Sequence, residues 1–398
     1  MTDDDLDAKL ARLTRLSEAF TPSAPVRRRD LFAGRINEIM SVASALSEPG
    51  RQVVLYGERG VGKTSLANII SQFRYQGDHH GDVTTVRVNC QTNDTFGSIW
   101  KRVFLEAQRQ VPDSWTYGAP EPDEVRRLLG SGPTMVVILD EFDRVDDDDS
   151  LSLMADLLKA VSDHAITTKI IVVGVASSID QLIGEHESVQ RAIEEVLMPR
   201  MSQEDMEGII SAGAAHAGVT FSAEAITYIT RLAEGLPHYV HLLALAAGRR
   251  CIQNDEELVS VVDVEMASQD VIRSHSLLRE YQTAVQSSRS ESLFAHVLAA
   301  CALAEKNKLG QFTSGAVRAP LSQIMGRPYA IPAFAPHLKA FTEGDRGCVL
   351  VQEGVPRRYT YRFRNPLLQP FAVLAALTSG IVPEAMVGDP SSRDTLDE

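Results

Sequence analysis

The stretch Gly57-Glu58-Arg59-Gly60-Val61-Gly62-Lys63-Thr64, followed by Ser65, decides the fold, because it has the spacing G-x-x-x-x-G-K-[ST]. It follows a short apolar stretch and precedes a helical one. The glycines let successive backbone N–H groups turn toward a phosphate, and the helix N-terminus adds a positive dipole end. Lys63 can reach the β- and γ-phosphates, and the Thr64 hydroxyl can bind Mg²⁺. The alternative is a glycine-rich turn without a ligand.

A second motif follows downstream, where the apolar run Met135-Val136-Val137-Ile138-Leu139 leads into Asp140-Glu141. A buried strand that ends in two acids places them at the carboxyl edge of the sheet, beside the phosphate loop. Asp140 is expected to hold Mg²⁺ through its water shell, and Glu141 to polarise the attacking water. The alternative is a solvated acidic loop, which is the interpretation we give to the acidic run 146–149.

Strand and helix patterns alternate around these motifs from about residue 31 to 199. The predicted strands are 52–56, 83–89, 135–139 and 169–175. They are short, rich in β-branched residues and mostly apolar, which is typical of a parallel sheet buried on both faces. We therefore predict an α/β fold class, with a doubly wound parallel sheet that carries the phosphate loop.

The rest of the chain divides into smaller units. Residues 201–286 have the pattern of successive helices, and 287–378 that of three helices followed by two strands, which is the order of a winged helix. The predicted organisation is an amphipathic helix with a linker (1–25), the nucleotide-binding domain (26–200), an all-α lid (201–286), the winged-helix domain (287–378) and a disordered tail (379–398).

Composition limits the classes of protein to consider. The 398 residues are 44% hydrophobic and 23% charged, as in soluble globular proteins. No apolar run approaches the roughly 20 residues that span a bilayer, and the acidic N-terminus has no apolar signal-peptide core, so we expect no membrane partner. The four cysteines form no CxxC pair, which argues against zinc or a disulfide framework and favours a cytoplasmic location.

Charge is unevenly spread along the chain. The net charge of −14 argues against a protein that coats nucleic acid over its whole surface. Residues 291–380, however, carry ten basic against five acidic side chains. A local positive face on an acidic protein is compatible with a confined nucleic-acid site.

Other classes of phosphate-loop protein fit less well. A GTPase needs N-K-x-D, but Asn307-Lys308 is followed by Leu and Gly. An LSGGQ-like signature of ABC-type ATPases is missing, and a small-molecule kinase does not usually pair Asp with Glu at the strand end. These comparisons favour ATP hydrolysis.

Together the motifs resemble AAA+ P-loop ATPases, in particular the origin-recognition and initiator clade and the related STAND-type ATPases, over about residues 31–375. The resemblance implies ATP and Mg²⁺ as cofactors and a homo-oligomer. The segment that contains Phe32 and Arg35 resembles the one that packs against adenine in the family. Asn89 matches a polar residue that can hold the catalytic glutamate, here Glu141, in an inactive position.

The resemblance implies three further site residues. Ser177 matches a position that senses the γ-phosphate, although it would also suit a helix or turn cap. Arg191, with Arg200 as the second choice, resembles the arginine finger that a neighbouring subunit supplies, or is a surface arginine. His238 stands where initiator ATPases place an arginine. The pair Pro237-His238 is more similar to STAND-type proteins. His238 either contacts phosphate when protonated or caps a helix. The sequence does not decide whether the ATPase is a slow switch or a rapid motor.

The resemblance also implies an output through the winged helix. Four arginines of the predicted wing could neutralise DNA phosphates: Arg357, Arg358, Arg362 and Arg364. In STAND-like proteins the same domain often packs against the ATPase and regulates it. Two hypotheses therefore remain. The local charge favours an oligomer that loads or remodels something on DNA, and the alternative is a nucleotide-gated signalling switch, for example in bacterial defence, with a protein effector.

Overall fold

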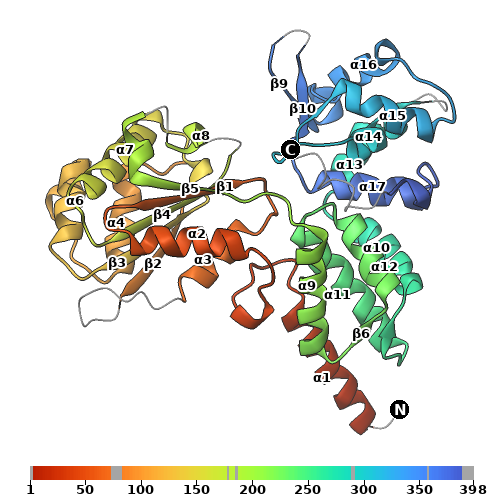
Figure 1. The fold of residues 1–398 in the computed structure, drawn as a ribbon, viewed down its shortest axis with the longest axis horizontal. Helices are drawn as coiled ribbons and strands as arrows, with labels where there is room; N and C mark the ends of the chain where they lie inside the picture. The colour runs from red at the N-terminus through yellow and green to blue at the C-terminus, as the bar shows by residue number, and fades with distance from the viewer. Residues whose placement is uncertain are drawn as a thin grey trace.

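Three regions make up the chain in the computed structural model, which describes residues 3–72, 83–176, 179–183, 187–287, 292–355 and 358–387. An α/β region carries the phosphate loop, a helical lid follows it, and a C-terminal domain lies beside both (Figure 1). Within the described ranges, no helix has the length and apolar character needed to cross a membrane.

A five-stranded parallel sheet forms the centre of the α/β region. Its strands are β1 (Gln52–Gly57), β2 (Thr84–Asn89), β3 (Met135–Asp140), β4 (Lys169–Val175) and β5 (Ile193–Leu197), in the order β2-β3-β4-β1-β5. The predicted doubly wound α/β fold is confirmed. We did not predict β5, because its sequence Ile-Glu-Glu-Val-Leu has two acids. As an edge strand it keeps Glu194 half-exposed, where Ser41 and Arg51 bind the carboxylate.

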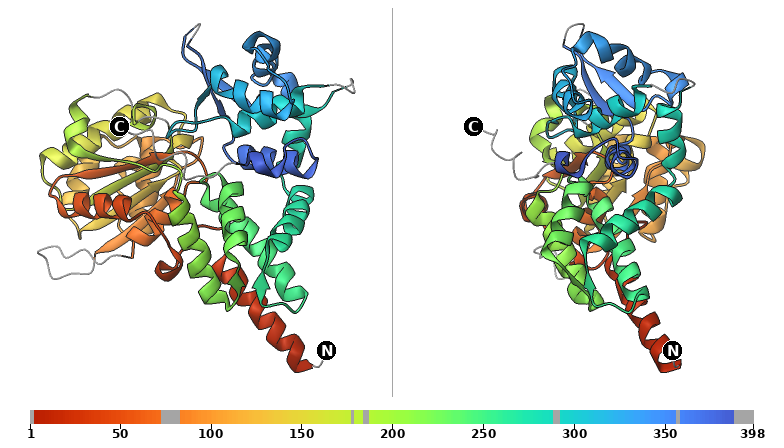
Figure 2. Two further views of the ribbon diagram at one scale, coloured as in Figure 1. Left: turned by 45° about the vertical axis from the view of Figure 1, so that its right-hand side comes forward. Right: turned by 90° about the vertical axis from the view of Figure 1, so that its right-hand side faces the viewer.

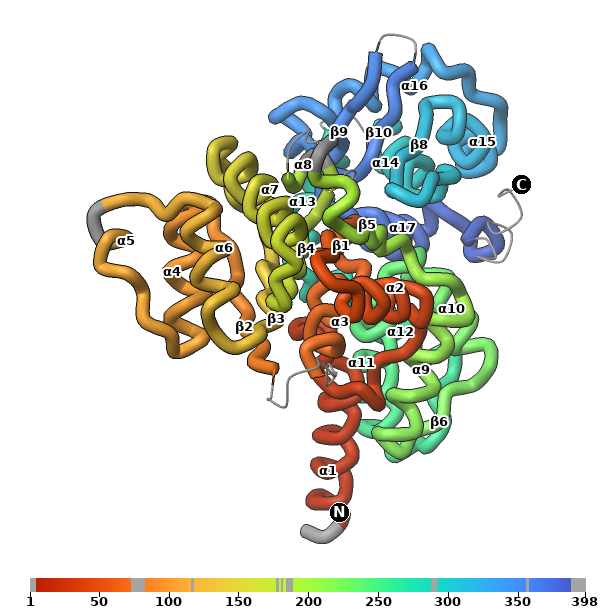
Figure 3. The backbone as a smooth tube through the Cα atoms, turned by 60° about the vertical axis from the view of Figure 1, so that its left-hand side comes forward, coloured from red at the N-terminus to blue at the C-terminus, as the bar shows by residue number. Residues whose placement is uncertain are grey.

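Helices cover both faces of this sheet (Figure 3). The helices on one face are α2 (Ile36–Ser47) and α3 (Lys63–Ile70), and those on the other are α4 (Phe96–Glu106), α6 (Pro122–Gly130) and α7 (Asp148–Asp163). Successive strand residues point to opposite faces, so Val53 and Leu55 pack with the first group while Val54 packs with the second. In the acidic run 146–149, predicted to be solvated surface, three residues are exposed, and the partly buried Asp147 caps α7 by accepting from the Ser150 N–H.

The lid is entirely helical apart from one short strand pair. Its helices are α9 (Gln203–Ala217), α10 (Ala223–Ala233), α11 (Pro237–Gln253), α12 (Val261–Ser274) and α13 (Leu278–Val285). The N-terminal helix α1 (Asp3–Ala19) docks here, with the Phe20 ring against Gly213 and Leu16 against Gly248. A Cβ at either glycine would lie within 3 Å of these side chains, so the helices meet closely. The first turns of α1 project away from the body (Figure 2).

The C-terminal domain has the predicted order of elements. Helices α14 (Phe294–Leu303), α15 (Ser314–Ile324) and α16 (Ile331–Ala340) precede β9 (Leu350–Glu353) and β10 (Thr360–Phe363), and the short β8 (Phe312–Thr313) pairs with β10. A last helix, α17 (Leu368–Thr378), was not predicted as a helix because it is apolar all round and shows no amphipathic stripe.

The disordered tail predicted for 379–398 is wrong for its first part. Val382 and Val387 are buried, with 2% and 4% of their surface exposed, and the backbone of Ile381 donates to Ala376 at the end of α17. The apolar side chains of this segment are therefore packed against the core, while Pro383, Glu384 and Ala385 stay exposed. Residues 388–398 lie outside the described part of the chain.

Candidate nucleotide-binding site

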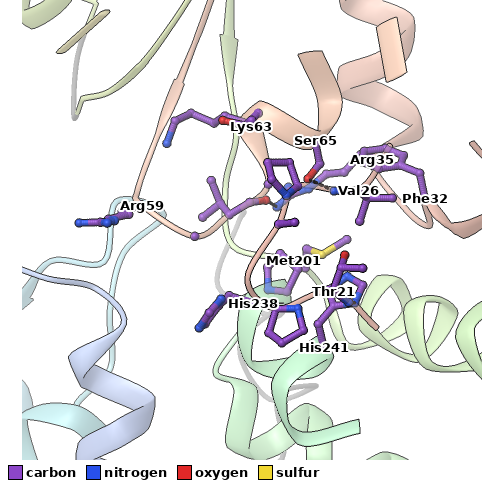
Figure 4. A pocket seen from close by; sticks show the side chains of 18 of the residues that line it. Thr21, Val26, Phe32, Arg35, Arg59, Lys63, Ser65, Met201, His238 and His241 are labelled. Atoms are coloured by element: carbon purple, nitrogen blue, oxygen red, sulfur yellow. Dashed lines mark hydrogen bonds between the residues drawn. The ribbon is translucent and has the colours of Figure 1, made fainter. Parts of the chain in front are cut away.

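A pocket of about 710 Å³ lies between the phosphate loop, the end of β3 and the start of α11 (Figure 4). Lys63 and Ser65 lie on one side of it, and Thr21, His238 and His241 on the opposite side. Of the residues 57–65, which are predicted to contact nucleotide, 59–65 line the pocket, whereas Gly57 and Glu58 do not. Gly62 immediately precedes α3 with φ +100°, a conformation that side chains other than glycine rarely adopt.

The Lys63 amine is buried against its own loop. It donates hydrogen bonds to the carbonyl oxygens of Gly57 at 2.9 Å and Glu58 at 2.7 Å. Burial lowers the pKa of Lys63 to about 8, and the carboxylates of Asp143 and Asp140 oppose this shift. An anion in the pocket would favour the charged amine and raise this pKa again.

Thr64 and Asp140 offer an oxygen pair to a cation. The Thr64 hydroxyl donates to Asp140 Oδ1 at 3.3 Å, and the Asp140 side chain is almost fully buried at the end of β3. Hard oxygen ligands next to a phosphate site are what Mg²⁺ requires, so these residues fit the predicted ion. Arg87, on β2, pairs with the other oxygen of Asp140 and with Asn68, and so neutralises the carboxylate from the opposite side.

Glu141 follows β3 in a left-handed conformation, with φ 55°, and its side chain lines the pocket. Its carboxylate pairs with Arg144 Nη1 at 3.0 Å. Within the described residues, no hydrogen bond joins Asn89 to Glu141. Asn89 lies instead in a second hollow, lined also by Arg87 and Arg102. The partner of Glu141 in this conformation is thus Arg144, three residues along the same turn.

The N-terminal linker closes the other end of the pocket. The Val26 N–H donates to the Ser65 hydroxyl at 3.1 Å, and the Thr21 N–H donates to Nδ1 of His241 at 3.4 Å. Residues 21–26 therefore run across the gap from the lid to α3. Burial lowers the pKa of His241 to about 4, so its neutral ring can accept this bond. The sequence predicts only a linker here, and its two prolines are the one feature that indicates a restricted backbone conformation.

The three remaining predicted nucleotide contacts also line this pocket: Phe32, Arg35 and His238. The guanidinium of Arg35 is occupied within the protein, because it donates to the carbonyls of Val61 at 3.1 Å and Pro199 at 2.5 Å. It thereby joins the phosphate loop to the segment that leads into the lid. Burial, and then the neighbouring His275, lower the pKa of His238, which favours a neutral ring.

Sequence comparison assigns this site to a family. Residues 19–264, more than half of the chain, match the family described as Novel STAND NTPase 1. The chain belongs to this STAND NTPase family. No curated protein matches the sequence.

The fold of this STAND NTPase is shared with solved AAA+ structures. The ORC2 protein of Aeropyrum pernix superposes with a TM-score of 0.50 at 16% identity, over 92% of this chain and 98% of that one. A Walker-type ATPase of Pyrococcus abyssi gives a TM-score of 0.50 at 18% identity, over 89% of this chain and 99% of that one. The predicted AAA+ fold of the origin-recognition type is confirmed.

The two arginines predicted as candidates for the arginine finger differ in exposure and in their ion-pair partners. Arg191 is exposed over 73% of its side chain and pairs at the surface with Asp163 at 2.9 Å. Arg200 is mostly buried, pairs with Glu58 of its own phosphate loop at 2.8 Å and donates to the Glu234 carbonyl. In this conformation both contacts of Arg200 therefore lie within its own subunit. Ser177 lies outside the described residues.

The C-terminal domain touches the phosphate loop directly. The Leu367 side chain packs on Gly60, since a Cβ at Gly60 would lie 2.8 Å from Leu367 Cδ2. The Tyr239 hydroxyl of the lid donates to the Leu367 carbonyl at 2.6 Å and fixes this contact. Gly310 similarly lies against the Glu58 carboxylate, which Arg200 holds from the other side.

The wing arginines have separate environments. Arg362 pairs with Glu353 across the β9–β10 hairpin at 2.7 Å and is half-buried. Arg358 and Arg364 are exposed. Arg357 lies outside the described residues. Of the four predicted wing arginines, Arg362 is thus neutralised within its own hairpin.

Proposed function

We propose that this STAND NTPase binds and hydrolyses ATP and acts as a nucleotide-gated switch, in which the C-terminal winged-helix domain docks on the phosphate loop. The contact of Leu367 with Gly60 is the observation that carries this proposal. Because the phosphate loop also contacts the C-terminal domain, nucleotide binding to the loop can change the position of that domain. This was the alternative interpretation of the sequence, and the contact makes it the preferred one.

The proposed roles of the site residues follow from their chemistry. Lys63 binds the β- and γ-phosphates, and the backbone N–H groups of 60–65 surround them. Thr64 and Asp140 hold Mg²⁺, which neutralises phosphate charge when bound. Glu141 orients the attacking water, and Ser177 contacts the γ-phosphate. Asn89, which is turned into the second hollow, would reach Glu141 only in another conformation.

The docked domain should stabilise the loop conformation in which Lys63 bonds to Glu58. In this conformation the Lys63 amine bonds to the Glu58 carbonyl, while the Glu58 side chain is held between Arg200 and Gly310. Binding of phosphate by Lys63 breaks its bond to Glu58 and so disturbs a loop residue that contacts the C-terminal domain. Coupling of this kind is reciprocal, so ATP should loosen docking and docking should weaken ATP binding.

Leu367→Ala tests this proposal, with Leu377→Ala as the matched control at a partly buried leucine of the same domain. We expect Leu367→Ala to bind ATP several-fold more tightly in calorimetry, since the docked state is weakened. ATP should also speed amide hydrogen exchange in 365–378 of the parent protein. Unchanged ATP affinity in Leu367→Ala, together with exchange that does not respond to ATP, would refute the switch.

A homo-oligomer remains part of the proposal. Arg191 is exposed and only its surface pair with Asp163 would have to open for it to reach a neighbouring site. If it acts in trans, Arg191→Ala should lose turnover and regain it when mixed with Lys63→Ala subunits. Failure of this rescue would leave Arg191 a surface residue.

DNA binding through the wing is the second candidate, and the exposed Arg358 and Arg364 favour it. The exposed face of α16 offers Pro332, Ala333 and Pro336 with a single lysine, which is poor in groups that read base edges. Any DNA contact should therefore be electrostatic and independent of sequence. A gel shift at low salt that is absent, or unaffected by Arg358→Ala and Arg364→Ala, would exclude this candidate.

A further inference from the structure

We propose that Arg144 is a positioning residue that exchanges partners during the nucleotide cycle. Without nucleotide it holds the Glu141 carboxylate, and with ATP bound it contacts the γ-phosphate and releases Glu141 to orient water. This inference rests on the proposed binding of ATP, and it names the group that would distinguish ATP from ADP at this site.

The geometry places Arg144 within reach of both partners. Arg144 and Glu141 line the same pocket as Lys63 and Thr64, and their ion pair measures 3.0 Å. The two side chains are 50% and 52% exposed. A half-exposed pair of this kind is weak, so an incoming anion can take the guanidinium from the carboxylate.

The backbone that carries Arg144 is fixed, which confines the exchange to its side chain. The short 3₁₀ turn Phe142–Arg144 is anchored by the fully buried Phe142 ring. The Asp143 carboxylate accepts the Val175 N–H at 2.8 Å, which ties the turn to the end of β4. A long, flexible side chain on a rigid turn can change partners without movement of the sheet.

The chemistry favours the γ-phosphate over the carboxylate. A guanidinium presents paired N–H donors that match phosphate oxygens, and the γ-phosphate carries more negative charge than Glu141. ADP lacks this group, so only ATP should break the Glu141 pair. While the pair persists, Glu141 is neutralised and its carboxylate is engaged by Arg144, which makes it a poor base for water.

The test compares the affinities for ADP and for the β,γ-imido analogue of ATP, both with Mg²⁺, by calorimetry. Arg144→Gln should weaken binding of the analogue roughly tenfold and leave ADP affinity within about twofold. Arg144→Lys should restore part of the difference. Arg127→Gln is the matched control, because Arg127 forms a similar exposed ion pair, with Asp123, outside the pocket.

A double-mutant cycle separates exchange from a structural role. Glu141→Gln removes the competing carboxylate, so it should tighten binding of the analogue several-fold in the parent and not in the Arg144→Gln background. Equal effects of Arg144→Gln on both nucleotides, or a Glu141→Gln effect that persists without Arg144, would overturn the exchange. If the parent protein binds neither nucleotide, the proposed function fails as well. If it binds both and Arg144→Gln leaves their ratio unchanged, only the role of Arg144 fails.

Discussion

The two ends of the nucleotide pocket are constructed in different ways. The phosphate end comes from two short motifs, the loop 57–65 and the pair Asp140-Glu141, which the parallel sheet brings to one edge. The opposite end is assembled from the linker 21–26 and the start of α11, which are more than 200 residues apart. The first end therefore determines chemistry locally, whereas the second makes nucleotide binding sensitive to the position of the lid.

The strongest test of this contrast is Lys63→Ala at the phosphate end. Lys63 carries the one lysine charge among the residues that line the described pocket, so its loss should reduce ATP affinity at least roughly 100-fold. Calorimetry with ATP and Mg²⁺ measures this. Lys169→Ala is the control, because Lys169 is also buried against backbone carbonyls but lies outside the pocket. It should lower thermal stability and leave affinity unchanged. Parent-like affinity in Lys63→Ala would contradict the loop assignment.

Glu141→Gln tests whether the same end performs chemistry as well as binding. The amide keeps the shape of the side chain but cannot polarise water as a carboxylate does, so turnover should fall by roughly 100-fold or more while ATP still binds. Phosphate release under saturating ATP provides the measurement. Turnover equal to that of the parent would remove Glu141 from the proposed role.

The titration of Lys63 sharpens the contrast further. Burial lowers its pKa to about 8, below the usual value for lysine, and bound phosphates favour the charged form. ATP affinity should be nearly complete at pH 7 and decline as pH rises through 8, by roughly tenfold between pH 7 and pH 9. Calorimetry at pH 9 in buffers of different ionisation enthalpy should show uptake of nearly one proton. Affinity that is flat over this range would mean that Lys63 stays charged without nucleotide.

The contrast also explains what the sequence could predict. Motif spacing predicted the phosphate loop, and the apolar run before Asp140-Glu141 predicted the position of this pair, because each motif is contiguous and its strand fixes its place in the sheet. The apolar pattern also predicted four of the strands. It missed β5, because the two glutamates of this edge strand interrupt the apolar pattern. The family resemblance pointed to Asn89 as the partner of Glu141, yet the local turn places Arg144 there in this conformation.

Contacts between distant segments were beyond sequence reasoning. Nothing in the sequence around Leu367 indicates that it packs on Gly60, and nothing around Thr21 indicates His241. The family resemblance made Arg200 the second choice for the arginine finger, and its pairing with Glu58 could not be predicted because it depends on how the lid lies against the loop. Local pattern therefore predicted the elements and the chemistry, whereas the links between domains required the structure.

The smallest expected effect concerns the end of the pocket that the linker closes. His241→Leu removes the acceptor for the Thr21 N–H while it keeps an apolar side chain in a buried position. A neutral hydrogen bond of this kind contributes about 1 kcal/mol, so ATP and ADP should both bind a few-fold more weakly. Equal losses for the two nucleotides would show that this end positions the part they share, in contrast to Arg144, whose loss should affect ATP alone. If His241→Leu instead weakened ATP and not ADP, the linker would belong to γ-phosphate recognition and the division of the pocket into two ends would fail.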